Sequence, residues 1–137
     1  MLKKLFTSLV LAATIVFLYA PDVVSAEMGY APQTSDERGI KVTVTPQSIP
    51  NEANIWNFEV TLETHTQALG DDLAKSAVLI ADGKQYLPLG WEGAPPGGHH
   101  RKGWLRFKAI VQQPRSIELQ LHLAGDTSPR SFKWQLK

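Results

Sequence analysis

Three histidines and two aspartates stand in the two segments that interrupt the strand pattern of this chain. His65 belongs to "LETHTQALGDDL", where Asp71 and Asp72 follow it, and His99 and His100 are adjacent in "GWEGAPPGGHHRKGW". Imidazole and carboxylate ligands in one site suit Zn²⁺ or Cu²⁺. Adjacent histidines on an extended chain point apart. The sequence therefore predicts a metal site from these five residues if the fold brings one of the two adjacent histidines to His65.

Other roles for the histidines stay open at this point. Their spacing matches no compact motif such as H-E-x-x-H, so hydrogen bonds that stabilise two loops are the alternative interpretation. The chain has no cysteine, which excludes a blue-copper site because that site needs a thiolate. Met28 is the only methionine after Met1, which disfavours a methionine-rich Cu(I) site. If a cofactor is bound, we expect divalent Cu or Zn.

The segment around residues 90–103 also offers groups for an anion or a protein partner. Gly97 and Gly98 can present backbone N–H groups as an anion-binding nest. Arg101 can hold a carboxylate or phosphate in a bidentate fashion, and Trp91 is the type of residue that anchors protein interfaces. The alternative is that Arg101 is an ordinary solvated residue or pairs with Glu92 across the loop.

Neither catalysis nor nucleic-acid binding is indicated. The chain contains no G-x-S-x-G sequence and no recognisable arrangement of a catalytic triad. Nucleic-acid modules usually carry a clear basic excess. Without Lys3, Lys4 and Asp22, which lie in the N-terminal segment described next, the 14 basic and 13 acidic residues become 12 and 12. We therefore expect a chain that is not an enzyme and that binds no nucleic acid.

The N-terminus predicts a targeting segment. Lys3 and Lys4 precede an apolar run from Leu5 to Ala20, and "VSA" before Glu27 offers small residues for signal peptidase. The run is short for a membrane span of about 20 residues. Residues 1–26 are therefore expected to be a cleaved signal peptide. The mature protein is then exported, periplasmic or extracellular, without a stable membrane anchor.

Apolar residues alternate with polar ones over most of the remaining chain, which predicts half-buried strands. The expected inward residues are Trp56, Phe58, Val60, Leu62, Leu105, Phe107, Ala109, Val111, Ile117, Leu119, Leu121, Leu123, Phe132, Trp134 and Leu136. "IKVTVT" near residue 40 predicts a further strand, and Asp82-Gly83 predicts a tight hairpin turn. Only "LGDDLAKSA" favours a helical turn.

About seven strands joined by short turns predict an all-β fold, an antiparallel immunoglobulin-like β-sandwich. We expect one domain over residues 40–137, preceded by a flexible polar leader at residues 27–39. One connection is unusually long, at about 13 residues between Leu89 and Trp104, and loops of that length are typically functional or disordered.

Several stretches together resemble a known group of sequences. "THTQALGDDL", "YLPLGWEGAPPGGHHRKGWLRF" and "RSFKWQL" look like small uncharacterised exported bacterial β-sandwich proteins with a W-E-G…G-G-H-H-R-x-G signature. The resemblance covers most of the expected mature chain. It implies an exported β-sandwich and carries no activity that can be transferred to this chain.

These patterns together predict an exported, non-catalytic binding or accessory protein. The sharper hypothesis is a divalent Cu or Zn ion bound by His65 and the His99-His100 loop, with Asp71 or Asp72. The alternative is a protein-interaction module that presents the 90–103 loop to a partner in the cell envelope, with Trp91 exposed.

Overall fold

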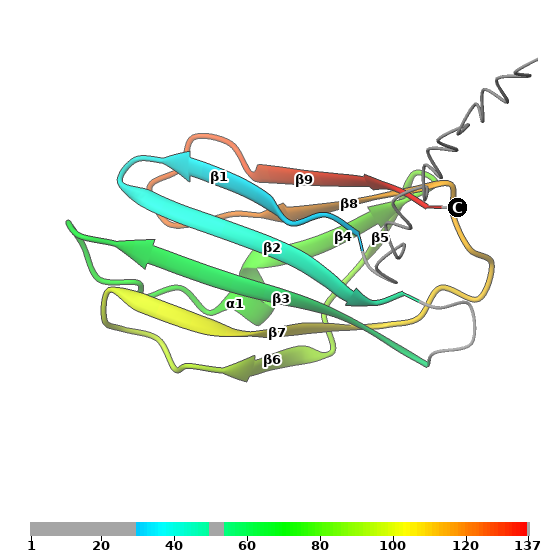
Figure 1. Ribbon diagram of the computed structural model, residues 1–137, viewed down its shortest axis with the longest axis horizontal. Coiled ribbons are helices and arrows are strands. Elements are labelled where there is room, and N and C mark those ends of the chain that lie inside the picture. Colours follow the sequence, from blue (N-terminus) through cyan, green and yellow to red (C-terminus); the bar gives the residue numbers. More distant parts are fainter. Residues whose placement is uncertain (1–29, 50–53, 137) are drawn as a thin grey trace, which may run out of the picture.

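The computed structural model describes residues 30–49 and 54–136, so the predicted signal peptide lies outside the described residues. Within them, nine strands form two antiparallel sheets that face one another (Figure 1). The larger sheet has the order β1-β2-β3-β7-β6, and the smaller has the order β5-β4-β8-β9. The strands are β1 (Gln33–Glu37), β2 (Ile40–Ser48), β3 (Ile55–Thr64), β4 (Ala77–Ala81), β5 (Lys84–Tyr86), β6 (Gly90–Gly93), β7 (His100–Lys108), β8 (Ser116–Leu121) and β9 (Arg130–Gln135). The all-β sandwich is confirmed, with nine strands where about seven were predicted.

The core lies between the sheets, where the alternating apolar residues predicted it. Trp56, Phe107, Ile117, Leu121 and Phe132 are among the buried residues, and most polar residues of the strands face outward. Burying one such large apolar side chain contributes about 1.5–3 kcal/mol. The ring of Phe58 packs edge-on against that of Phe107, with 5.6 Å between the ring centroids. With no cysteine in the chain, this apolar contact between the sheets is the main source of stability.

Val111 is the clear exception, because the prediction that it faces inward is wrong. Its side chain is 95% exposed. The strand β7 ends at Lys108, and the Ala109 N–H donates to the carbonyl of Asn54, at 3.0 Å. The chain therefore leaves the sheet before Val111, and the alternation that governs β7 no longer applies to it.

Two short turns were predicted correctly. Asp82 and Gly83 have φ angles of 49° and 76°, which is the conformation of a type I′ hairpin turn between β4 and β5. The helical turn is α1 (Leu73–Ser76). Asp72 caps it by accepting a hydrogen bond from the Ala74 N–H, at 3.1 Å.

The predicted flexible leader is wrong where it overlaps β1. Five of its residues form this strand, which pairs with β2 from Gln33↔Val44 to Glu37↔Ile40. An edge strand needs backbone partners more than apolar side chains, so a polar sequence can form one. Residues 27–29 of the leader lie outside the described part of the chain.

The same strand seals one long side of the sandwich. The side-chain amide of Gln33 donates to the carbonyl of Lys133 and accepts from the Lys133 N–H, so it takes up a peptide unit on the edge of β9. The indole N–H of Trp134 donates to the carbonyl of Ala31, at 2.8 Å. Strand β1 thus connects the two sheets, and the edge of β9 is covered.

A buried arginine holds the turn that follows β1. Arg130 is 3% exposed, and its guanidinium donates to the carbonyls of Glu37 and Ile40, at 2.8 and 2.6 Å. It also donates to the carboxylate of Asp126, at 2.9 Å, and that side chain is equally buried. The charge is therefore fully compensated inside the protein, as a buried charge requires.

Candidate functional site

The segment expected to be one long loop is mostly a hairpin. Strand β6 pairs with β7 from Gly90↔Arg106 to Gly93↔Gly103, so only residues 94–99 lie between the two strands. The two paired glycines make this possible, because a Cβ on either one would collide with the backbone of the other strand. Glycine inside a strand pattern often marks such a close approach. That signal was present in the sequence, and the expectation of a 13-residue loop was wrong.

The tip of this hairpin lies against the segment that follows β3. The Thr64 N–H donates to the carbonyl of His99, and the Leu69 N–H donates to that of Gly98, both at 2.9 Å. The Gly97 N–H donates back to the carbonyl of Leu69, at 2.7 Å. In Figure 1 the end of β3 and the start of β7 lie at the same end of the sandwich. The fold therefore brings His65, His99 and His100 to one corner of the larger sheet.

We call His65, His99, His100 and Glu63 the histidine corner. His100 pairs with Glu63 in the register of β3 and β7, and its Nδ1 lies 3.6 Å from Oε1 of that carboxylate. By strand alternation, Glu63 and His100 lie on the outer face of the sheet and His99 takes the opposite parity to His100, while His65 is the first residue after the end of β3. All four residues are exposed. The corner thus offers one imidazole and one carboxylate that share a face, with two further exposed imidazoles, His65 and His99, next to them in the chain.

These side chains do not form a ready-made metal site. Among residues 30–49 and 54–136, no group of three or more His, Asp or Glu side chains is placed to hold one metal ion. To bind one ion, the imidazoles of His65 and His100 and the carboxylate of Glu63 would have to rotate toward a common point. Such rotations between staggered rotamers are open to exposed side chains.

The two predicted aspartate ligands have structural partners instead. Asp71 accepts a hydrogen bond from the Ala124 N–H, at 3.0 Å. Asp72 caps α1, as described above, and forms a loose ion pair with Lys75, at 4.0 Å. Both carboxylates therefore fix the segment that crosses from the larger to the smaller sheet. The structure brings the three histidines together and gives the aspartates this other role.

Arg101, predicted as an anion contact, is buried and fully engaged. Its guanidinium donates to the carbonyls of Asp71, Ala94 and Leu69, at 2.7, 3.2 and 3.3 Å, and the side chain is 1% exposed. Burial lowers the pKa of Arg101 from its ordinary value, and the nearby charges of Asp71 and Asp72 oppose that shift. The side chain joins the hairpin to the segment after β3 and is buried, so it is not accessible to an outside anion.

Trp91, predicted as a partner contact, supports the same cluster. The face of its ring lies 5.7 Å from the guanidinium carbon of Arg101, a cation–π distance, and its N–H donates to the carbonyl of Ala94, at 2.9 Å. The ring is half-buried. Glu92 pairs with Arg106, at 2.7 Å, and not with Arg101 as the alternative interpretation expected. We call Arg101, Trp91 and their three carbonyl partners the arginine clamp.

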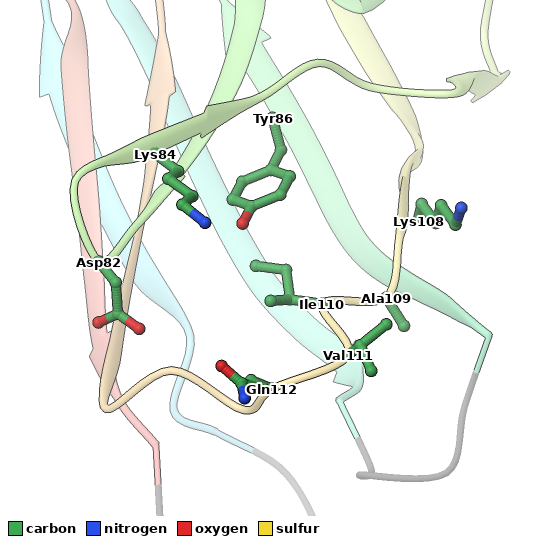
Figure 2. A pocket seen from close by; sticks show the side chains of 8 residues that line it. All are labelled: Asp82, Lys84, Tyr86, Lys108, Ala109, Ile110, Val111 and Gln112. Atoms are coloured by element: carbon green, nitrogen blue, oxygen red, sulfur yellow. The ribbon is translucent and has the colours of Figure 1, made fainter.

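A shallow hollow lies at the opposite end of β7 from the histidine corner. It has a volume of about 400 Å³ and opens between β5 and the segment after β7 (Figure 2). Its lining consists of Asp82, Lys84, Tyr86, Lys108, Ala109, Ile110, Val111 and Gln112. This feature was not predicted, because its residues are distant in the sequence and meet only when the two sheets pack.

Comparisons with known proteins add no assignment. The chain matches no protein-family model and no curated protein, so the resemblance drawn from its sequence stays a prediction. In the described part of the chain, no helix has the length and apolar character needed to cross a membrane.

Proposed function

We propose that this chain is an exported, non-catalytic binding protein of the cell envelope, and that its working surface is the histidine corner. The observation that carries the proposal is the arginine clamp, which fixes the backbone beneath the exposed histidines. The clamp holds Ala94 and Leu69, and the residues between them and the histidines are joined by backbone hydrogen bonds. A surface that is already ordered loses less conformational entropy on binding, which favours affinity.

A divalent transition metal is the ligand that the side chains of this corner favour. His65 and His100 supply imidazole nitrogens, and Glu63 supplies a carboxylate oxygen already 3.6 Å from one of them. Zn²⁺ and Cu²⁺ both accept this mixture of ligands. Because the three side chains must rotate to meet, we expect affinity in the micromolar range and not the far tighter binding of a closed structural site.

Calorimetric titration of the processed chain, residues 27–137, with Zn²⁺ and Cu²⁺ tests this proposal. We expect His65→Ala and His100→Ala each to weaken binding by about tenfold or more, equivalent to about 1.4 kcal/mol. His99→Ala should have a smaller effect, because its side chain has the opposite parity. His122→Ala is the matched control, since His122 is an exposed histidine at the end of β8. Binding that is equal in all four variants, or no binding at millimolar metal, contradicts the proposal.

A protein partner is the second candidate ligand of the same surface. It is favoured by the short, fixed hairpin tip at residues 94–99, where Pro95 and Pro96 are exposed. The proposed contact is this tip and His99, and it excludes Trp91, which is half-buried in the clamp.

Photo-crosslinking in intact cells tests this second candidate. A photo-reactive amino acid at position 99 should give a discrete cross-linked product, and the same group at Lys133 should not. Lys133 is exposed on the outer face of the other sheet and serves as the matched control. The product should disappear when residues 95–98 are replaced by Asn-Gly, a sequence that closes a two-residue hairpin. Identical products at both positions contradict a specific contact at the tip.

A further inference from the structure

The two long sides of the sandwich differ in how well their edge strands are covered. The side of β1 and β9 is sealed by Gln33, Trp134 and Arg130, as described above. The side of β5 and β6 carries two of the three large hydrophobic residues that are exposed in the described part of the chain, and the third lies in the segment after β7, at the hollow beside β5. Leu87 and Leu89, which join these strands, are 77% and 61% exposed, and Val111 at the hollow is 95% exposed. Exposed apolar residues that gather on one side of a protein commonly mark a contact surface.

The edge of β5 is open to a further strand. The type I′ turn makes Ala81↔Lys84 the first hydrogen-bonded pair of the hairpin, and Leu79↔Tyr86 is the next pair of the same kind. Gln85 stands between them, so its backbone N–H and C=O point away from β4. Free backbone groups on an edge strand are a template for another polypeptide. These backbone N–H and C=O groups pair with those of another extended chain, so the expected ligand is a peptide in a β-strand conformation.

The hollow lies directly beside this edge. Figure 2 shows Lys84 and Tyr86 reaching from β5 into the same space as Ile110 from the segment after β7. Tyr86, Ala109, Ile110 and Val111 give the hollow apolar walls. In strand addition, backbone hydrogen bonds provide affinity and pockets for alternate side chains provide specificity. An apolar side chain of an added strand can therefore occupy the hollow.

The charges around the hollow specify the ligand further. Lys84 and Lys108 line it, and Asp82 is the only carboxylate in the lining. No ion pair joins either lysine to another residue among those described. A ligand with an acidic side chain near its apolar one complements this surface.

We propose that the open side binds an extended peptide segment of a partner protein. The segment adds as an outer strand to β5, places an apolar side chain in the hollow and an acidic side chain near Lys84 and Lys108. This contact is independent of the histidine corner, since the two lie at opposite ends of β7.

The probe for this proposal is a phage-displayed library of random heptapeptides, selected on the processed chain, residues 27–137. We expect enriched peptides to combine an apolar residue with an acidic one and to bind as synthetic peptides in fluorescence anisotropy. Gln85→Pro removes the outward N–H and should weaken binding by about tenfold or more, since proline is tolerated on an edge strand but cannot donate. Gln85→Ala is the matched control, because it changes the side chain, keeps the backbone and should leave the affinity unchanged.

Val111→Glu keeps the test decisive if Gln85→Pro does not fold. Val111 is almost fully exposed, so this change should leave the fold intact while placing a like charge against the acidic peptide. We expect a loss of binding of about tenfold or more. Enriched peptides without this composition, or equal affinity for the Pro, Ala and Glu variants, overturn the proposal. A concentration-dependent dimer in analytical ultracentrifugation, abolished by Gln85→Pro, also overturns it, because a second copy of the chain is then the occupant.

Discussion

Replacing Arg101 with leucine is expected to lower the free energy of unfolding by about 3–5 kcal/mol, because several hydrogen bonds from a charged donor are lost together and each contributes about 1.5–3 kcal/mol. The guanidinium is 1% exposed and donates to carbonyls on both the hairpin and the segment after β3. Leucine fills part of the space but leaves the carbonyl of Asp71 without this donor, while the carbonyls of Leu69 and Ala94 keep the N–H groups of Gly97 and Trp91. Each buried acceptor left unsatisfied costs about 1–3 kcal/mol.

Urea unfolding followed by tryptophan fluorescence measures this loss. Lys102→Leu is the matched control, because Lys102 is the next residue of β7, is exposed and forms only a surface ion pair with Glu59, at 3.7 Å. Its effect should stay below about 1 kcal/mol. Amide exchange at Gly97 and Leu69 should accelerate in the Arg101 variant. Equal stabilities for the two variants would show that the arginine clamp does not hold the corner.

Replacing Arg130 with methionine is expected to have a comparable effect, about 3–5 kcal/mol. The change leaves the carboxylate of Asp126 buried without its closest partner and removes the donor to the carbonyls of Glu37 and Ile40. The remaining contact of that carboxylate is with Arg38, at 3.7 Å, whose side chain is 58% exposed. A surface pair of this kind cannot replace a buried hydrogen-bonded one.

The matched control for this prediction is Arg38→Met, which should cost less than about 1 kcal/mol. The double variant Arg130→Met with Asp126→Asn should be more stable than Arg130→Met alone, because it removes the uncompensated buried charge. Urea unfolding of the four proteins at one pH gives the comparison. If the double variant is no more stable than the single one, the loss comes from packing and from the carbonyls alone.

Strand alternation was sufficient to predict most of the core. Where a strand is half-buried, as in β3 and β8, every second residue is apolar and the inward face can be counted along the sequence. The strands that were missed are edge strands with no apolar alternation. Strand β1 is polar, and β6 contains two glycines in four residues. Their positions follow from backbone pairing with β2 and β7, which a hydrophobic pattern does not record.

The histidine corner shows how much of a site can be predicted from the sequence. The sequence identified the three histidines of the corner but not Glu63, because only the pairing of β3 with β7 shows that His100 faces this residue. The burial of Arg101 could have been predicted from the sequence, because counting back from Leu105 in steps of two gives Gly103 and then Arg101 on the inward face. The sequence interpretation made Arg101 an anion contact or a solvated residue, because the strand was expected to begin only near Trp104. The roles of Asp71 and Asp72 depend on distant backbone groups and could not be derived in this way.

Strand β7 also sets the distance between the histidine corner and the hollow. It is paired with β3 over nine consecutive residues, from His100 at one end to Lys108 at the other. At about 3.3 Å per residue these ends stand roughly 26 Å apart. Strand β7 is paired with β3 over this whole length and with β6 from Gly103 to Arg106, so backbone hydrogen bonds fix the separation of the two ends. The histidine corner and the hollow are therefore held at a set distance and orientation to one another.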